Sequence, residues 1–141
     1  KGQKISSKKE IFNLIDTVIL TLEEQKFVSD KYYSDAKSKT MLRRGYSLNK
    51  IRFNLIKKGI DEKYIKASIS KVKQNESDPD FFSAIKICKR RRIGPVREEG
   101  NRPLFFKKDI SILARSGFSY EISKKILDMP KDEFKKFCKM L

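Results

Sequence analysis

The sequence contains no histidine, no tryptophan and only two cysteines, and these absences exclude several kinds of site. Without histidine, neither a Ser–His–Asp nor a Cys–His catalytic arrangement can be built. Cys88 and Cys138 stand 50 residues apart and form no CxxC pair, which argues against a zinc finger and against a disulfide framework. We therefore expect both thiols to be ordinary helix residues in a reducing cytoplasm.

The motifs that cradle phosphate groups, GxxxxGK[ST] and GxGxxG, are also absent. The carboxylate pairs Glu98-Glu99 and Asp132-Glu133 have basic and polar neighbours, so nothing indicates the burial that would raise a pKa for acid–base catalysis. We predict that the protein is not an enzyme and needs neither a metal nor a cofactor. Helix-terminal and surface roles explain these carboxylates better.

Long apolar runs are missing as well. None approaches the ~20 residues that a membrane span requires, and the start at Lys1 shows no apolar signal region. We therefore expect no membrane association. Because the sequence does not begin with methionine, we also expect it to begin inside a longer protein.

Basic residues, in contrast, are abundant. Lys and Arg total 34 against 18 Asp and Glu, which gives a net charge of +16 and a pI near 9.9. This balance is typical of a protein that binds nucleic acid or another polyanion. A merely soluble basic protein is the alternative that charge alone leaves open.

Apolar residues recur at helical spacing throughout, with no alternating run and no hairpin signal. The first periodic segment, residues 8–25, is expected to be one helix; Ser29 and Asp30 are expected to cap a second helix that Gly45 ends. The later expected starts and stops are capping residues, prolines and glycines: Ser47, Gly59, Asp61, Asp78, Pro79, Gly94, Pro103, Gly117, Ser119 and Pro130. The fold class is therefore predicted to be all-α.

The expected helices repeat along the chain. Tyr33 precedes Gly45 by 12 residues, Phe82 precedes Gly94 by the same 12, and a basic run comes just before each glycine. The next glycine follows after 14 residues in one copy and 23 in the other, and the extra nine lie in the 94–103 loop. Each unit is thus three helices long, with its basic residues at the end of the first helix.

We divide the chain into residues 1–27, the last helix of an earlier and mostly missing repeat; residues 28–77, a second three-helix repeat; and residues 78–141, a third repeat with a C-terminal helix. Three short helices bury little apolar area alone, so neighbouring units must share surface. We expect an elongated tandem array of three-helix repeats, acting as a monomer.

The basic residues gather at matching positions of the two units. Arg43-Arg44 and the run 89–92 occupy equivalent places, and the 47–58 helix carries no acid. The residues that we expect to contact phosphates or an acidic groove are Arg43, Arg44, Lys50, Arg52, Lys57, Lys58, Lys89, Arg90, Arg91, Arg92, Arg97, Arg102, Lys107, Lys108 and Arg115. The alternative is a solvated helix face, but repetition favours a contact surface.

Three stretches together resemble the RecX regulatory family. They are Phe27 to Ala36 with Arg43-Arg-Gly-Tyr-Ser, then residues 51–61, and then Arg92-Ile-Gly-Pro-Val-Arg97 with residues 108–119. The last stretch resembles the proteobacterial form, and the likeness covers about residues 9–141. It implies tandem three-helix repeats and a cytoplasmic bacterial protein of DNA repair, recombination and the SOS response. Such a protein binds the RecA recombinase filament along its groove and restrains the ATPase and strand exchange of RecA.

The sequence departs from the family in its nearly absent first repeat and its longer 94–103 loop, and nothing in it fixes the sign of the effect on RecA. Another reading is left open: a basic helical protein that binds single- or double-stranded DNA through phosphate contacts without any RecA partner. A protein of anionic membrane surfaces fits less well, because the apolar stripes are needed for packing between helices.

Overall fold

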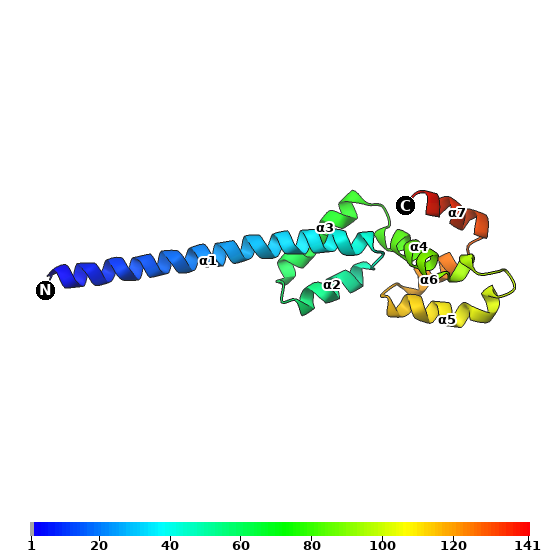
Figure 1. Cartoon of the computed structure of the whole chain (residues 1–141), viewed down its shortest axis with the longest axis horizontal. Coiled ribbons are helices and arrows are strands. Elements are labelled where there is room, and N and C mark those ends of the chain that lie inside the picture. The colour runs from blue at the N-terminus through cyan, green and yellow to red at the C-terminus, as the bar shows by residue number, and fades with distance from the viewer. Residues whose placement is uncertain (1) are drawn as a thin grey trace.

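The computed structural model describes the backbone of residues 2–141, and the side chains of residues 8–26 and 28–141. The helices, with one 3-10 turn η1, are α1 (Gly2–Arg43), α2 (Leu48–Lys57), α3 (Glu62–Asn75), α4 (Pro79–Arg91), η1 (Gly94–Val96), α5 (Arg102–Arg115), α6 (Tyr120–Leu127) and α7 (Lys131–Lys139). Within residues 2–141 there is no strand. The molecule is elongated (Figure 1). The predicted all-α, elongated fold is confirmed.

Helix α1 runs without interruption for 42 residues, so the predicted break at Ser29 and Asp30 is wrong. No glycine or proline occurs between Lys8 and Arg43. A serine and an aspartate inside an otherwise favourable helix cost only a few tenths of a kcal/mol each. Such a cost cannot stop a helix that has apolar and straight-chain residues on both sides.

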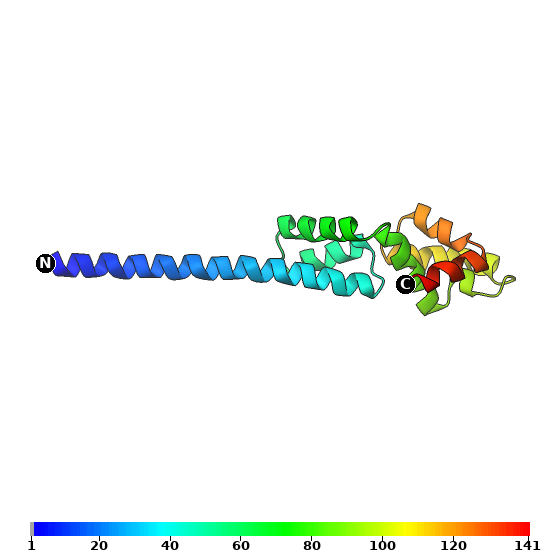
Figure 2. The ribbon, with the colours of Figure 1, turned by 90° about the horizontal axis from the view of Figure 1, so that it is seen from above.

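The first part of α1 extends away from all the other helices, as both views show (Figure 1, Figure 2). Its large apolar side chains are between 47% and 70% exposed: Ile11, Phe12, Leu14, Ile15, Val18, Ile19, Leu20, Leu22 and Val28. The assignment of residues 1–27 to an earlier repeat remains a prediction.

Two separate cores hold the remaining helices together. In the first, α2 and α3 pack on the end of α1, and Ile51, Leu55 and Ile65 are completely buried. In the second, α4 to α7 surround Ile85 and Leu113, also completely buried. The α3–α4 connection passes from one core to the other, at the place where the sequence divides residues 28–77 from 78–141; that division stays a prediction.

Glycines and short polar side chains end and begin most helices as predicted. Gly45 has φ +89°, and the turn is closed by bonds from Gly45 N to the Leu42 carbonyl (3.0 Å) and from Tyr46 N to the Met41 carbonyl (3.1 Å). This paired arrangement satisfies carbonyls that a helix end leaves without partners. The caps at Ser47, Asp61 and Ser119 are confirmed by bonds to the backbone of the first turn.

Helix α4 begins at Pro79 and ends next to Arg92, as predicted, but the details of both ends differ from the expected motifs. Pro79 is at its first position, but Asp78 before it makes no side-chain capping bond. At the other end Arg92 adopts the left-handed conformation that closes the helix, and Gly94, two residues later, also has a positive φ (+62°). Gly94 is required for another reason: a Cβ there would lie 2.6 Å from Leu127 Cδ2, closer than non-bonded carbons can approach.

A buried ion pair secures the loop that follows α4. The Asp109 carboxylate, 1% exposed, accepts bonds from Gly94 N (3.0 Å) and from Arg97 Nε and Nη2 (both 2.9 Å). The hydrogen bonds from Arg97 to Asp109 raise the pKa of Arg97 above its usual value. The guanidinium also lies 4.2 Å from the Phe105 ring centroid. Asp109 therefore joins the loop to the middle of α5.

Changing Asp109→Asn should lower the free energy of unfolding by about 3 kcal/mol, at the low end of what breaking a buried pair costs because Arg97 keeps some contact with water. The amide has the same shape, so the loss comes from charge and hydrogen bonding. Denaturant unfolding followed by circular dichroism measures it. Asp128→Asn, at an exposed carboxylate 3.9 Å from Lys124, is the control and should cost under about 0.5 kcal/mol. Equal effects would contradict the assignment.

Candidate polyanion interface

The two cores meet at the short turn between α1 and α2. Ser47 Oγ donates a hydrogen bond to the Ser116 carbonyl (2.8 Å) at the end of α5 and also caps α2 by accepting from Lys50 N (3.1 Å). Asp80, in the first turn of α4, accepts from Leu48 N (2.8 Å). The first free amides of α2 are thus bound partly by its own cap and partly by the other core.

This junction brings the ends of α1 and α4 side by side. Arg90 Nη1 donates to the Arg44 carbonyl (2.8 Å), and Lys86 Nζ lies 3.4 Å from the Leu42 carbonyl. The Leu42 carbonyl already accepts from Gly45 N, and both carbonyls lie at the end of α1, where a positive charge is favourable. The sequence placed the two basic runs at equivalent positions; the structure shows that they are also neighbours.

We call the basic residues at the ends of these two helices the junction cluster. Its members are Arg43, Arg44, Lys86, Lys89, Arg90, Arg91 and Arg92. All except the half-buried Lys86 are exposed, and none forms an ion pair with a carboxylate in the part of the chain that the structure describes. Unpaired like charges repel one another, so a bound anion would lower the electrostatic repulsion at this surface.

Other members of the predicted surface already have partners inside the protein. Arg97 is bound to Asp109, and the Arg102 guanidinium donates to the carbonyls of Leu127 (2.7 Å) and Met129 (2.6 Å). Their side chains are only 18% and 14% exposed. As a correction to the predicted surface, we assign both arginines to the connection between the 94–103 loop and neighbouring helices.

The remaining predicted residues lie on α2 and α5. Arg52 pairs with Glu62 at 2.9 Å, and Lys57 Nζ lies 5.0 Å from the Phe53 ring centroid. Those with no carboxylate partner in residues 8–26 and 28–141 are Lys50, Lys57, Lys58, Lys107, Lys108 and Arg115. The structure does not join them to the junction cluster by a hydrogen bond. They can add to the positive field of the molecule without forming one contact surface.

Arg92 holds an unusual backbone conformation, with φ +56° and ψ +48°. A side chain with a Cβ costs about 1 kcal/mol in this left-handed region, where glycine costs little. The helix is nevertheless closed, because Ile93 N donates to the Cys88 carbonyl (3.1 Å). Arginine at this position is therefore less stable than glycine would be, and this strain could not be recognised from the residue type or the spacing.

Neither thiol has the features of a reactive group. Burial, with a smaller contribution from the Asp109 charge, raises the pKa of Cys88 to about 12. Burial also raises the pKa of Cys138. Thiolates are the reactive form, so both cysteines are suited to packing. Within the described residues, no cluster of three His, Cys, Asp or Glu side chains could hold a metal ion, and no helix combines the length and apolar character of a membrane span.

Comparison with known proteins gives one informative match. The chain is 28% identical over 116 residues to a protein of Myxococcus xanthus (strain DK1622) named Regulatory protein RecX, covering 81% of this chain. The chain spans 60% of the length of that relative. No protein-family model matches the chain, and no solved structure matches it. The predicted resemblance to the RecX family is confirmed by this relative.

Arg92→Gly should raise the free energy of unfolding by about 0.5–1 kcal/mol, because glycine adopts the left-handed conformation without strain. Arg91→Gly is the matched control: it removes the same charge from the last helical position and should lower stability by up to about 1 kcal/mol. Thermal or denaturant unfolding would show the opposite signs. Destabilisation by both changes would mean that Arg92 makes a contact that outweighs its backbone strain.

Proposed function

We propose that this chain is a regulatory protein that binds the RecA recombinase filament on DNA, lies along its groove and restrains its ATPase and strand exchange in DNA repair, recombination and the SOS response. It acts in the cytoplasm, as a monomer, by binding and not by catalysis. The junction cluster is the observation that carries this proposal. Similarity to the RecX relative directs it to RecA in particular.

The cluster favours DNA as part of the target. Its guanidinium groups can each form two parallel bonds to a phosphate, and a net charge of +16 attracts a polyanion over distances set by salt. The Arg90 bond to the Arg44 carbonyl uses one of five donors. The others remain available to a phosphate.

The shape favours a long partner. The two cores follow one another along the molecule (Figure 1, Figure 2), and the junction cluster lies between them. An extended molecule can contact several subunits of a filament at once, and such linked contacts strengthen binding well beyond each one alone. A groove lined by DNA phosphates would place anions beside the cluster.

DNA binding should weaken steeply with salt. If about four to six phosphates are neutralised, log K against log salt should have a slope of roughly −3 to −4 on single strands. Fluorescence anisotropy with a labelled oligonucleotide measures the slope. The salt range is about 50 to 300 mM, where counterion release dominates the affinity. An affinity independent of salt would show that the cluster is a solvated surface.

Two double variants test the cluster: Arg43→Ala with Arg44→Ala, and separately Arg91→Ala with Arg92→Ala. Each should weaken binding to RecA–DNA filaments by at least about tenfold, since the loss of even one charged hydrogen bond costs about 1.5–3 kcal/mol. Arg90 is kept because its bond to the Arg44 carbonyl holds the two cores together. Lys135→Ala with Lys136→Ala, at exposed positions on α7, is the control with equal charge loss.

The readout is the DNA-dependent ATPase of RecA, measured at protein concentrations that leave bare DNA uncoated. The unchanged chain and the α7 control should lower the ATPase, and both cluster variants should have lost most of this effect while remaining folded. If the ATPase does not respond although the chain binds DNA, the reading as a nucleic-acid binder without a RecA partner is correct. A folded cluster variant that acts normally would move the contact surface to another face.

A further inference from the structure

A cleft of about 350 Å³ lies between α1, α3 and α4 and shares Arg43 and Lys86 with the junction cluster. Its floor contains Leu42 and Val72, each 6% exposed. Around them stand Lys39 and Arg43 from α1, Lys86 from α4 and one exposed acid, Glu76, just after α3, so cations outnumber acids at this rim. An apolar floor with a few polar groups at the rim, in a volume of this size, is typical of a binding site. Neither Lys39 nor Lys86 was among the residues predicted from the sequence.

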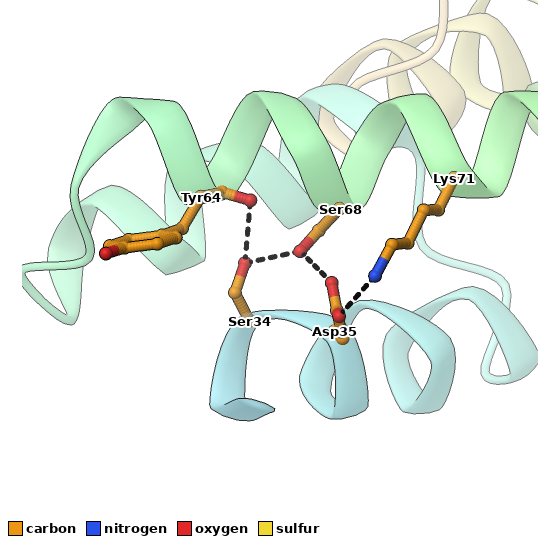
Figure 3. A network of polar contacts seen from close by, with 5 residues as sticks. All are labelled: Ser34, Asp35, Tyr64, Ser68 and Lys71. Atoms are coloured by element: carbon orange, nitrogen blue, oxygen red, sulfur yellow. Dashed lines mark hydrogen bonds and ion pairs between the residues drawn. The ribbon is translucent and has the colours of Figure 1, made fainter. Parts of the chain in front are cut away.

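The other end of the cleft is fixed by a polar network between α1 and α3 (Figure 3). Ser68 Oγ donates to Asp35 Oδ1 (2.6 Å), and Lys71 Nζ donates to Asp35 Oδ2 (2.8 Å). Ser34 Oγ lies 2.7 Å from Ser68 Oγ and also donates to the Tyr64 carbonyl (3.3 Å). Because Ser68 gives its one proton to the carboxylate, Ser34 shares its own proton between Ser68 and Tyr64. This network fixes α3 against α1 and gives the cleft a defined wall.

The network also decides which charges are left for a ligand. Burial acts to raise the pKa of Asp35, but the hydrogen bonds from Lys71 and Ser68 outweigh it and hold the pKa below its usual value. Asp35 and Lys71 therefore satisfy each other. Two cations, Lys39 and Arg43, have no such carboxylate partner among the described residues, and Lys86 faces only a backbone carbonyl.

We propose that this cleft binds an acidic peptide segment of a partner protein, with an apolar side chain on Leu42 and Val72 and carboxylates on Lys39, Arg43 and Lys86. A nucleic acid suits it less well, because no aromatic side chain is among those that line it and single strands bind by stacking bases on aromatic rings. The proposal does not depend on a RecA partner, since peptide binding is measurable without DNA or a filament.

The first experiment uses the whole chain and a fluorescein-labelled peptide, Glu-Leu-Asp-Phe-Glu-Asp, followed by fluorescence anisotropy. A control peptide has serine in place of the leucine and the phenylalanine and keeps all four acidic side chains. The control should bind at least about fivefold more weakly, because it cannot bury an apolar side chain on the floor. Equal binding of the two peptides would overturn the proposal, since only unspecific attraction to a basic surface ignores the apolar residues.

Variants separate the cleft from the general charge of the protein. Asn75→Trp places a large side chain at the exposed end of α3, where Asn75 lines the cleft, without changing the charge. It should weaken peptide binding about tenfold. Lys39→Glu should do the same, whereas Lys66→Glu, exposed on α3 outside the cleft, makes an equal charge change and should have under about a threefold effect, since a distant exposed charge is screened.

DNA binding is the third measurement. Asn75→Trp should leave oligonucleotide affinity within about twofold of the unchanged chain, because it removes no cation. If this variant keeps its helical circular dichroism spectrum and binds the peptide normally, the cleft is not the peptide site. If it instead loses DNA binding and peptide binding together, the cleft belongs to the nucleic-acid surface. Either result would overturn the proposal, and neither would contradict the RecA assignment.

Discussion

The rest of the structure depends on the polar junction between the α1–α2 turn and the ends of α4 and α5. Ser47 is completely buried there, where it caps α2 and reaches the Ser116 carbonyl. No side chain could replace the hydrogen at Gly117 without meeting Ser47. Because buried polar groups must be bonded, these contacts fix how the second core sits on the first, and thereby where the ends of α1 and α4 meet.

That arrangement concentrates positive charge at a cost in stability. Each basic run alone would lie at a helix C-terminus, where cations are favourable. Together they form a surface whose charges are not offset by carboxylates in the described part of the chain, and Arg92 adds backbone strain to the repulsion. Proteins tolerate such local conflicts where a surface binds something, because a partner anion removes the repulsion. The same packing leaves the adjacent cleft open, with an apolar floor and a cationic rim.

Much of the fold could be read from the sequence because the relevant signals are local. A serine or aspartate cap, a proline in the first turn and a glycine beyond the last turn act within a few residues, so Ser47, Asp61 and Gly45 were assigned correctly. The expected break at Ser29 failed because a capping residue only permits a helix to begin and cannot end the one that precedes it. The left-handed conformation of Arg92 was not predicted, because Gly94 two residues later matched the repeat pattern; Gly94 packs closely on Leu127 instead.

The sequence by itself determined the all-helical fold, the excess of positive charge and the runs of arginine, since these follow from composition and from periodicity along the chain. It could not separate the arginines that face solvent from Arg97 and Arg102, whose partners Asp109, Leu127 and Met129 are 12, 25 and 27 residues away. Nor could it show that Arg44 and Arg90, 46 residues apart, share a hydrogen bond. Only tertiary structure decides such pairs, because burial and contact depend on how helices pack and not on spacing within one helix.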